Sequence, residues 1–233
     1  MKTLNILHLY PKEMNLYGDR GNILSLVRRC EWRGLKANII EYEPGDKFPE
    51  KVDIIFGGGG QDSGQEKIAS DLEKILTNLK ILIENGTPAL VVCGVYQLFG
   101  EFYEMSNGKK LKGAGILNLH TTAGKDRKIG NVVVETKLFG KVVGYENHSG
   151  LTFLDEFEQP LGKVLSGFGN NGQTGEEGII YKNCIGTYLH GPILPKNPKI
   201  TDFLLEKALG TDLEKLDDSL EDRARRVILS KTK

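Results

Sequence analysis

The 233-residue sequence is poor in cysteine and histidine, with three residues of the first and four of the second. Cys30, Cys93 and Cys184 show no Cys-x-x-Cys spacing, and so sparse and odd a set argues against a disulfide framework or a structural zinc site. The histidines lie far apart and form no His-Glu-x-x-His pattern. We therefore expect no metal in this chain, and a reducing compartment, the cytoplasm.

The chain also lacks an excess of charge of either sign, because 31 basic residues balance 31 acidic residues. Proteins that grip nucleic-acid backbones normally carry a basic excess, so the composition does not favour nucleic acid as a partner. No apolar run approaches the roughly 20 residues of a membrane-spanning helix. The few apolar residues before Pro11 favour a first strand rather than a signal peptide.

Short apolar runs alternate with amphipathic segments through the first hundred or so residues. Apolar runs predict strands, and helical periodicity predicts helices from about Asn22 to Gly34, over 65–85 and over 94–105. The predicted strands cover residues 4–10, 35–43, 52–56 and 88–92. Alternating strands and helices predict a parallel sheet with right-handed crossovers and helices on both faces.

The pattern changes after Gly108, where strand-like segments appear around residues 138–140. The stretch 178–191 predicts a hairpin that turns at Lys182-Asn183. A helix is expected over 197–210, with Asn197 as its cap and Gly210 as its end.

No linker or repeat divides the chain, and its length suits one core. We expect residues 1–210 to form a single three-layer α/β domain with a mostly parallel central sheet and antiparallel strands in its C-terminal half. Residues 211–233 are expected to be a charged helical tail.

Two glycine-containing segments follow predicted parallel strands, and α/β sheets place their sites at the carboxyl ends of such strands. FGGGGQD occupies residues 56–62, and Cys93-Gly94 follows the next strand. A helix dipole stabilises the thiolate of a cysteine at the start of a helix, and glycine amides can donate to an oxyanion. These features predict Cys93 as a nucleophile, with the N–H of Gly94 and that of Gly58 or Gly59 as oxyanion donors.

A thiol nucleophile needs a base, and His190 is the best candidate because it ends an apolar strand far along the chain. Each feature alone has a plainer interpretation. A lone cysteine at a strand end is more often packing, a lone histidine is more often structural, and a glycine run is most often a turn. The glycines also lack the Lys-Ser/Thr of a phosphate-binding P-loop. The glycine run, the cysteine and the histidine occur together, in this order, on one predicted α/β fold. Their joint occurrence favours a Cys–His pair.

CGVYQLFG, from Cys93 on, resembles the nucleophile elbow of class I glutamine amidotransferases, which are flavodoxin-like α/β proteins. TYLHGP around His190, and GYENHSG over 144–150, resemble motifs of the cobyric-acid-synthase-like branch. NLYGDRGN, GGGQD and LHGPILPKNP narrow the resemblance to the ammonia-supplying subunits of lipid II isoglutaminyl synthases. The resemblance covers about residues 4–210.

The resemblance implies that Cys93 attacks the side-chain amide of L-glutamine and that His190 transfers the protons. It implies that Arg127 and Gln97 bind the substrate, and an arginine fork suits a carboxylate because it can pair with two oxygens. No cofactor is expected in this chain. ATP and Mg²⁺ are expected on a Mur-ligase-like partner, which would amidate the D-glutamate α-carboxyl of the lipid II stem peptide to D-isoglutamine.

One position departs from the wider class. Pro192 stands where most members have a glutamate, two residues after the histidine, that orients the imidazole. Asp19, Glu146 or the pair Glu176-Glu177 could supply a carboxylate from within the chain. Our preferred hypothesis at this point is that the partner supplies it.

Two alternative functions remain open on the sequence alone. The chain could supply ammonia to a cobyrinate- or cobyric-acid-type amide synthase, although those enzymes are usually fused to an ATP-binding domain. It could also be a catalytically inactive scaffold that regulates a partner. The retained Cys93, Gln97 and His190 favour an enzyme.

Overall fold

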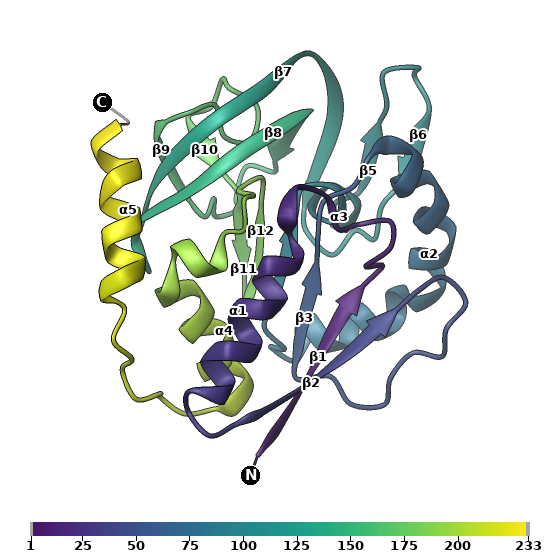
Figure 1. Cartoon of the computed structure of the whole chain (residues 1–233). Helices are drawn as coiled ribbons and strands as arrows, with labels where there is room; N and C mark the ends of the chain where they lie inside the picture. The colour runs from purple at the N-terminus through teal and green to yellow at the C-terminus, as the bar shows by residue number, and fades with distance from the viewer. Residues whose placement is uncertain (1, 232–233) are drawn as a thin grey trace.

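A computed structural model describes residues 2–231 of the chain (Figure 1). Its central sheet has six strands in the order β11-β12-β4-β3-β1-β2. These strands are β1 (Thr3–Leu9), β2 (Lys36–Tyr42), β3 (Ile54–Gly57), β4 (Ala89–Val92), β11 (Ile179–Tyr181) and β12 (Cys184–Thr187). Neighbours pair in parallel, except that β11 pairs antiparallel with β12. The predicted mostly parallel sheet is confirmed.

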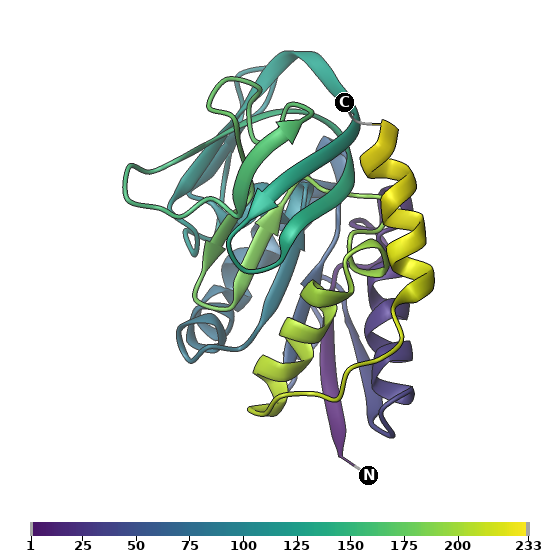
Figure 2. The same ribbon diagram turned by 90° about the vertical axis from the view of Figure 1, so that its left-hand side faces the viewer.

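Helices cover both faces of this sheet, which gives the predicted three layers. The helices are α1 (Arg20–Glu31), α2 (Asp62–Glu84), α3 (Gly94–Phe99), α4 (Pro198–Leu209) and α5 (Ser219–Lys231), with short 3-10 turns η1 (Leu16–Gly18) and η2 (Leu194–Lys196). α1 packs against α4, and α2 packs against α3 on the other side (Figures 1 and 2). Every residue of β3 and β4 is buried, as expected for strands covered on both faces.

A second sheet lies over the carboxyl end of the first and is mainly antiparallel. It contains β5 (Phe102–Glu104), β6 (Lys110–Lys112), β7 (Leu119–Thr136), β8 (Gly140–Leu154), β9 (Gly162–Ser166) and β10 (Glu176–Glu177). Its long β7–β8 hairpin arches over the molecule in Figure 1. The antiparallel strands predicted for the C-terminal half are therefore present.

One prediction of local structure was wrong. The helix predicted over 94–105 ends at Phe99, because Gly100 adopts extended backbone and the chain continues as β5. A Cβ on Gly100 would lie 2.7 Å from the backbone carbonyl oxygen of Leu119, so this close passage requires glycine. The strand-like segments expected around residues 138–140 are present as β7 and β8, and the Thr136 hydroxyl closes the turn between them by accepting from the Phe139 N–H.

Two other local predictions hold. β11 and β12 turn at residues 182–183, and Gly210 ends α4 in a left-handed conformation with a φ of 69°. Asn197 stands at the N-cap position of α4, but its side chain bonds elsewhere. Its Oδ1 accepts from the Val143 N–H and its Nδ2 donates to the Val143 carbonyl, which ties α4 to β8.

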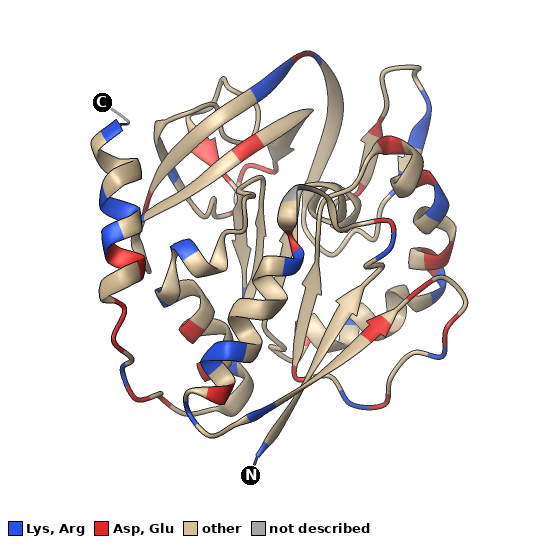
Figure 3. Ribbon diagram, in the orientation of Figure 1, with Lys and Arg blue, Asp and Glu red and all other residues tan. Residues whose placement is uncertain are grey.

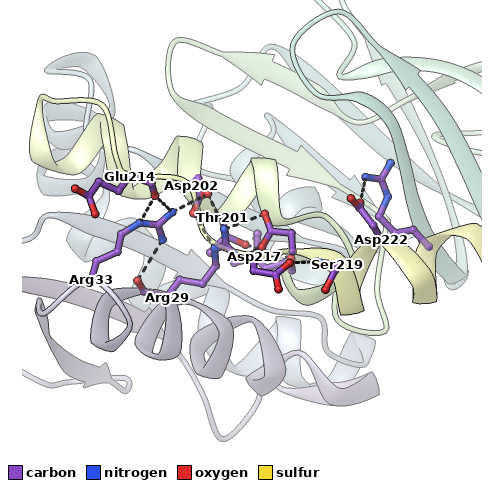
Figure 4. A network of polar contacts seen from close by, with 11 residues as sticks. Arg29, Arg33, Thr201, Asp202, Glu214, Asp217, Ser219 and Asp222 are labelled. Carbon is purple, nitrogen blue, oxygen red and sulfur yellow. Dashed lines mark hydrogen bonds and ion pairs between the residues drawn. The ribbon is translucent and has the colours of Figure 1, made fainter.

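The residues after α4 are attached to the domain by a buried arginine on α1 (Figure 4). Arg29, only 3% exposed, donates through Nε and Nη2 to both oxygens of Asp202 at 2.7 and 2.6 Å. Its Nη1 donates to Asp218 at 2.6 Å. Burial opposes the Arg29 charge, but its bonds to Asp202 and Asp218 outweigh this and raise its pKa. α5 follows directly and carries charges of both signs (Figure 3).

Arg29→Ala is expected to lower the free energy of unfolding by about 2–4 kcal/mol. The loss falls near the low end for a buried ion pair because Asp202 and Asp218 are 20% and 28% exposed. Arg28→Ala is the matched control, since its side chain is 68% exposed and pairs with Glu31 at the surface, so its cost is below about 0.5 kcal/mol. Urea titration measures both variants, and equal losses would contradict the assignment.

Candidate active site

Cys93 stands at a sharp turn between β4 and α3. Its backbone has a φ of 49° and a ψ of −102°, a region that residues other than glycine rarely adopt and that costs about 1–3 kcal/mol. Such a strained strand-to-helix turn is the arrangement that holds a nucleophile at the carboxyl edge of an α/β sheet. The side chain is 6% exposed and lines a pocket, so it is neither on the open surface nor sealed in the core.

His190 reaches the same edge of the sheet from the end of β12. Its backbone is fixed by two hydrogen bonds with Tyr145 of β8, at 2.8 and 3.2 Å. Burial of the imidazole would lower its pKa, but the charge and hydrogen bond of Cys93, together with Asp19, raise the pKa of His190 to about 10. The structure thus brings the two predicted residues into contact.

Asp19 supplies the carboxylate behind the histidine. It is fully buried at the start of α1, and its Oδ1 lies 3.1 Å from His190 Nδ1. Because a carboxylate accepts there, Nδ1 carries a proton and Nε2 is the nitrogen left for the Cys93 thiol. The sequence had offered Asp19 as one alternative and a partner's carboxylate as the preferred one. The structure brings the Asp19 alternative against the imidazole, and a carboxylate from the partner stays a prediction.

The other candidate carboxylates are engaged elsewhere. Glu146 accepts from the backbone N–H groups of Phe168 and Gly169 at 2.9 and 3.0 Å. Glu177, in β10, accepts from the Thr187 hydroxyl, and its burial raises its pKa to about 7. The Glu177 contact joins the second sheet to β12 of the central sheet, and the Glu146 contacts hold the segment after β9 to β8.

Cys93 opens into a polar pocket of about 410 Å³. The pocket lies between the start of α2, the elbow and the β7–β8 hairpin, and is lined by Gly60, Gln61, Asp62, Ser63, Cys93, Gln97, Tyr103, Arg127, Asn147, His148, Ser149 and Gly150. Both residues predicted to bind substrate, Arg127 and Gln97, are among them. The sequence therefore located three members of one pocket from segments that are distant along the chain.

Neighbours fix the orientation of both predicted binding residues. Arg127 Nε donates to Asn147 Oδ1 at 2.6 Å. Gln97 is 4% exposed, and its Oε1 accepts from Gln65 at 2.8 Å while its Nε2 donates to the Tyr188 hydroxyl at 2.9 Å. A held amide and a held guanidinium lose little freedom when a ligand binds.

The structure changes which amides of the glycine run are candidates for oxyanion donors. The Gly59 N–H already donates to Asp19 Oδ2 at 2.6 Å, and Gly58 packs against Met14, whose carbonyl lies 2.3 Å from the position of a Cβ. Gly60, not Gly58 or Gly59, lines the pocket beside Cys93. Its nitrogen also lies close to the first residue of α3, Gly94. Four consecutive glycines give no sequence signal for which amide faces the pocket.

His148 both lines the pocket and packs against a buried ring. It is 3% exposed, stacks on Tyr188 with ring centroids 3.6 Å apart, and donates from Nδ1 to the Gly150 carbonyl at 2.9 Å. Burial lowers its pKa, so it is a neutral ring in the wall. Asp62 and Tyr103 were missed by the sequence analysis, since neither belongs to a recognisable catalytic pattern.

Metal-binding clusters and membrane-spanning helices are considered for residues 2–231. No group of three or more histidine, cysteine or acidic side chains is arranged to hold a metal ion in this part of the chain. None of the helices in the described range is long and apolar enough to cross a membrane.

Comparison with known proteins identifies the class. The model of the CobB/CobQ-like glutamine amidotransferase domain matches residues 5–198, and the chain belongs to this family of glutamine amidotransferases. Among solved structures, PurLQS from Thermotoga maritima is similar in fold, with a TM-score of 0.61 and 16% identity over 88% of this chain and 99% of that one. The predicted α/β amidotransferase fold is confirmed.

Two curated relatives are similar over nearly the whole chain. One is the GatD subunit of the glutamine-hydrolysing lipid II isoglutaminyl synthase of Staphylococcus aureus (strain N315), 42% identical over 99% of this chain and 97% of the relative. The other is the GatD subunit of Streptococcus pneumoniae (strain ATCC BAA-255 / R6), 39% identical over 91% and 84%. The resemblance to lipid II isoglutaminyl synthase subunits is therefore confirmed.

Proposed function

We propose that this chain is the glutaminase subunit of a lipid II isoglutaminyl synthase. It hydrolyses L-glutamine and delivers ammonia to a MurT-like, Mur-ligase-type subunit that amidates the D-glutamate α-carboxyl of the stem peptide. One observation carries the proposal: Cys93, His190 and Asp19 meet beside a polar pocket that Cys93 lines, in a chain similar to GatD over almost its full length.

The first half-reaction forms a thioester. The Cys93 thiolate attacks the side-chain amide carbon of glutamine, and the carbonyl oxygen becomes an oxyanion, for which the Gly60 amide, which lines the pocket, and the Gly94 amide are the proposed donors. The carbon–nitrogen bond then breaks. The His190 imidazolium gives its proton to the departing nitrogen, so ammonia leaves and a glutamyl thioester remains.

The second half-reaction releases glutamate. His190, now neutral, takes a proton from a water molecule, and the resulting hydroxide attacks the thioester carbon. The carbon–sulfur bond breaks, which regenerates the thiolate beside the imidazolium. Asp19 holds Nδ1 through both steps, so Nε2 faces the reacting atoms each time.

Substrate binding falls to the side chains that line the pocket. Arg127 is the candidate partner of the α-carboxylate, and Gln97 lies one helical turn beyond the nucleophile, within reach of the bound side chain. The proposal assigns no cofactor to this chain and places ATP and Mg²⁺ on the partner. It also retains the cytoplasm as the compartment, where a free Cys93 thiol persists.

Labelled glutamine tests the proposal. The chain is purified with its co-purifying partner and given ATP, Mg²⁺, lipid II and L-glutamine labelled with ¹⁵N in the amide. We expect ¹⁵N in the D-isoglutamine of the stem peptide, detected by mass spectrometry. In a parallel reaction with a corrinoid carboxylic acid in place of lipid II, label in a corrinoid amide would favour the cobyric-acid alternative. Product formed from ammonium chloride but not from glutamine would favour the inactive scaffold.

A further inference from the structure

The pocket beside Cys93 carries opposite charges on separate structural elements. Asp62 begins α2 and Arg127 lies in β7, and both side chains line the pocket. Each has a hydrogen bond to an uncharged neighbour. The Tyr103 hydroxyl donates to Asp62 Oδ1 at 3.1 Å, and Arg127 Nε donates to Asn147 Oδ1 at 2.6 Å.

A free α-amino acid has the complementary pattern of charge. Its carboxylate and ammonium groups share one carbon, and in glutamine the reacting amide lies at the other end of the side chain. With Arg127 on the carboxylate and the amide at Cys93, the ammonium group needs an acceptor on another wall of the pocket. Asp62 is the acidic side chain among the lining residues.

We propose that Asp62 binds the α-ammonium group of the substrate and so restricts the site to free α-amino acids that carry a side-chain amide. The assignment rests on the proposed function and adds to it a residue that determines specificity. A peptide-bound glutamine, whose α-nitrogen is an uncharged amide, would leave the Asp62 carboxylate desolvated without a cationic partner.

The surroundings of Asp62 orient its carboxylate. It occupies the first turn of α2, where the helix dipole favours a negative side chain. Tyr103 is 2% exposed, and burial, followed by the charge of Asp62, raises its pKa. The hydroxyl therefore keeps its proton at neutral pH and donates to Oδ1, which directs the carboxylate without neutralising it.

A plainer role for Asp62 is to stabilise the N-terminus of α2. That role predicts a change in folding stability but no change in discrimination between ligands with and without an α-ammonium group. Two diazoketones separate the roles. 6-Diazo-5-oxo-L-norleucine carries the α-ammonium group, and 6-diazo-5-oxohexanoate lacks it. Each alkylates a thiolate by the same step: the diazo carbon is protonated, a carbon–sulfur bond forms and dinitrogen leaves.

The experiment compares alkylation rates of Cys93 in the full chain by mass spectrometry. Asp62→Asn is expected to slow the reaction with the L-norleucine reagent by about 10- to 100-fold, since it removes a hydrogen bond between charged groups. The rate with 6-diazo-5-oxohexanoate should change by less than about twofold. Asp62→Glu keeps the charge and should recover part of the loss.

Glu66→Gln is the matched control, because it removes one negative charge from the same helix at a site that pairs with Lys109 outside the pocket. It should leave both rates unchanged, and iodoacetamide should modify Cys93 equally in all variants. Equal slowing of both diazoketones by Asp62→Asn, or of neither, would overturn the inference. Failure of the wild-type chain to react with the L-norleucine reagent at Cys93 would overturn the proposed function instead.

Discussion

Cys93→Ala abolishes glutamine hydrolysis, with an expected loss of roughly 10⁴- to 10⁶-fold in kcat, the range seen when a hydrolase loses its nucleophile. The loss is this large because no other group can form the thioester. Cys93 is the thiol in contact with His190 and open to the pocket. Binding of the partner subunit should be unchanged, since the substitution removes one sulfur atom from a pocket wall.

The two remaining cysteines are the matched controls. Cys30 and Cys184 are fully buried, and burial raises the pKa of Cys30 to about 11 and that of Cys184 to about 12. Both stay protonated at neutral pH and are poor nucleophiles. Ammonia release, measured with a coupled glutamate dehydrogenase assay, should survive Cys30→Ala and Cys184→Ala. Glutamine-dependent product formation by Cys93→Ala would refute the mechanism.

The sequence predicted much of the site because of a geometric rule. Parallel strands deliver their carboxyl ends to one edge of a sheet, so a cysteine after β4 and a histidine after β12, which pairs with β4, must lie close together. The same rule brings in the glycine run after β3. Arg127 came from the resemblance alone, since a polar segment in β7 carries no periodic signal.

The remaining parts of the site depend on tertiary structure. Asp19 and His190 are 171 positions apart, and the loop that carries Asp19 has no pattern that points to β12. The choice among Gly58, Gly59 and Gly60 depends on tertiary contacts, because Asp19 already accepts from the Gly59 N–H and Gly60 is the one of the three that lines the pocket. The carboxylate of Asp62 is oriented by a hydrogen bond from Tyr103 on the second sheet. This contact between distant segments cannot be predicted from the sequence pattern of each strand.

Asp19→Asn is expected to lower kcat/KM by about 10²- to 10⁴-fold, as loss of the orienting aspartate does in serine hydrolases. An asparagine can still accept from the Gly59 N–H with its oxygen, but its NH₂ group then faces His190. That forces Nδ1 to become an acceptor and moves the ring proton to Nε2. The imidazole would present the wrong tautomer to Cys93, although the fold is intact.

The pH profile adds a readout that a folding defect would not produce. Asp19 helps to raise the pKa of His190 to about 10, so removing its charge lowers that pKa. The imidazolium, which protonates the departing nitrogen, is then lost at lower pH, so the alkaline limb of kcat/KM for glutamine hydrolysis should move to lower pH in Asp19→Asn. A profile that stays in place would contradict the pairing of Asp19 with His190.

The same variant decides between an internal and an external orienting group. If Asp19 orients His190 in the working enzyme, Asp19→Asn impairs the isolated chain and the complex with the partner to a similar extent. A carboxylate from the partner would instead restore most of the activity on assembly. The present geometry favours the first outcome, because Asp19 also holds the Gly59 N–H and so couples the base to the glycine loop around the thiol. Displacing the Asp19 carboxylate would therefore disturb both the histidine and the glycine loop.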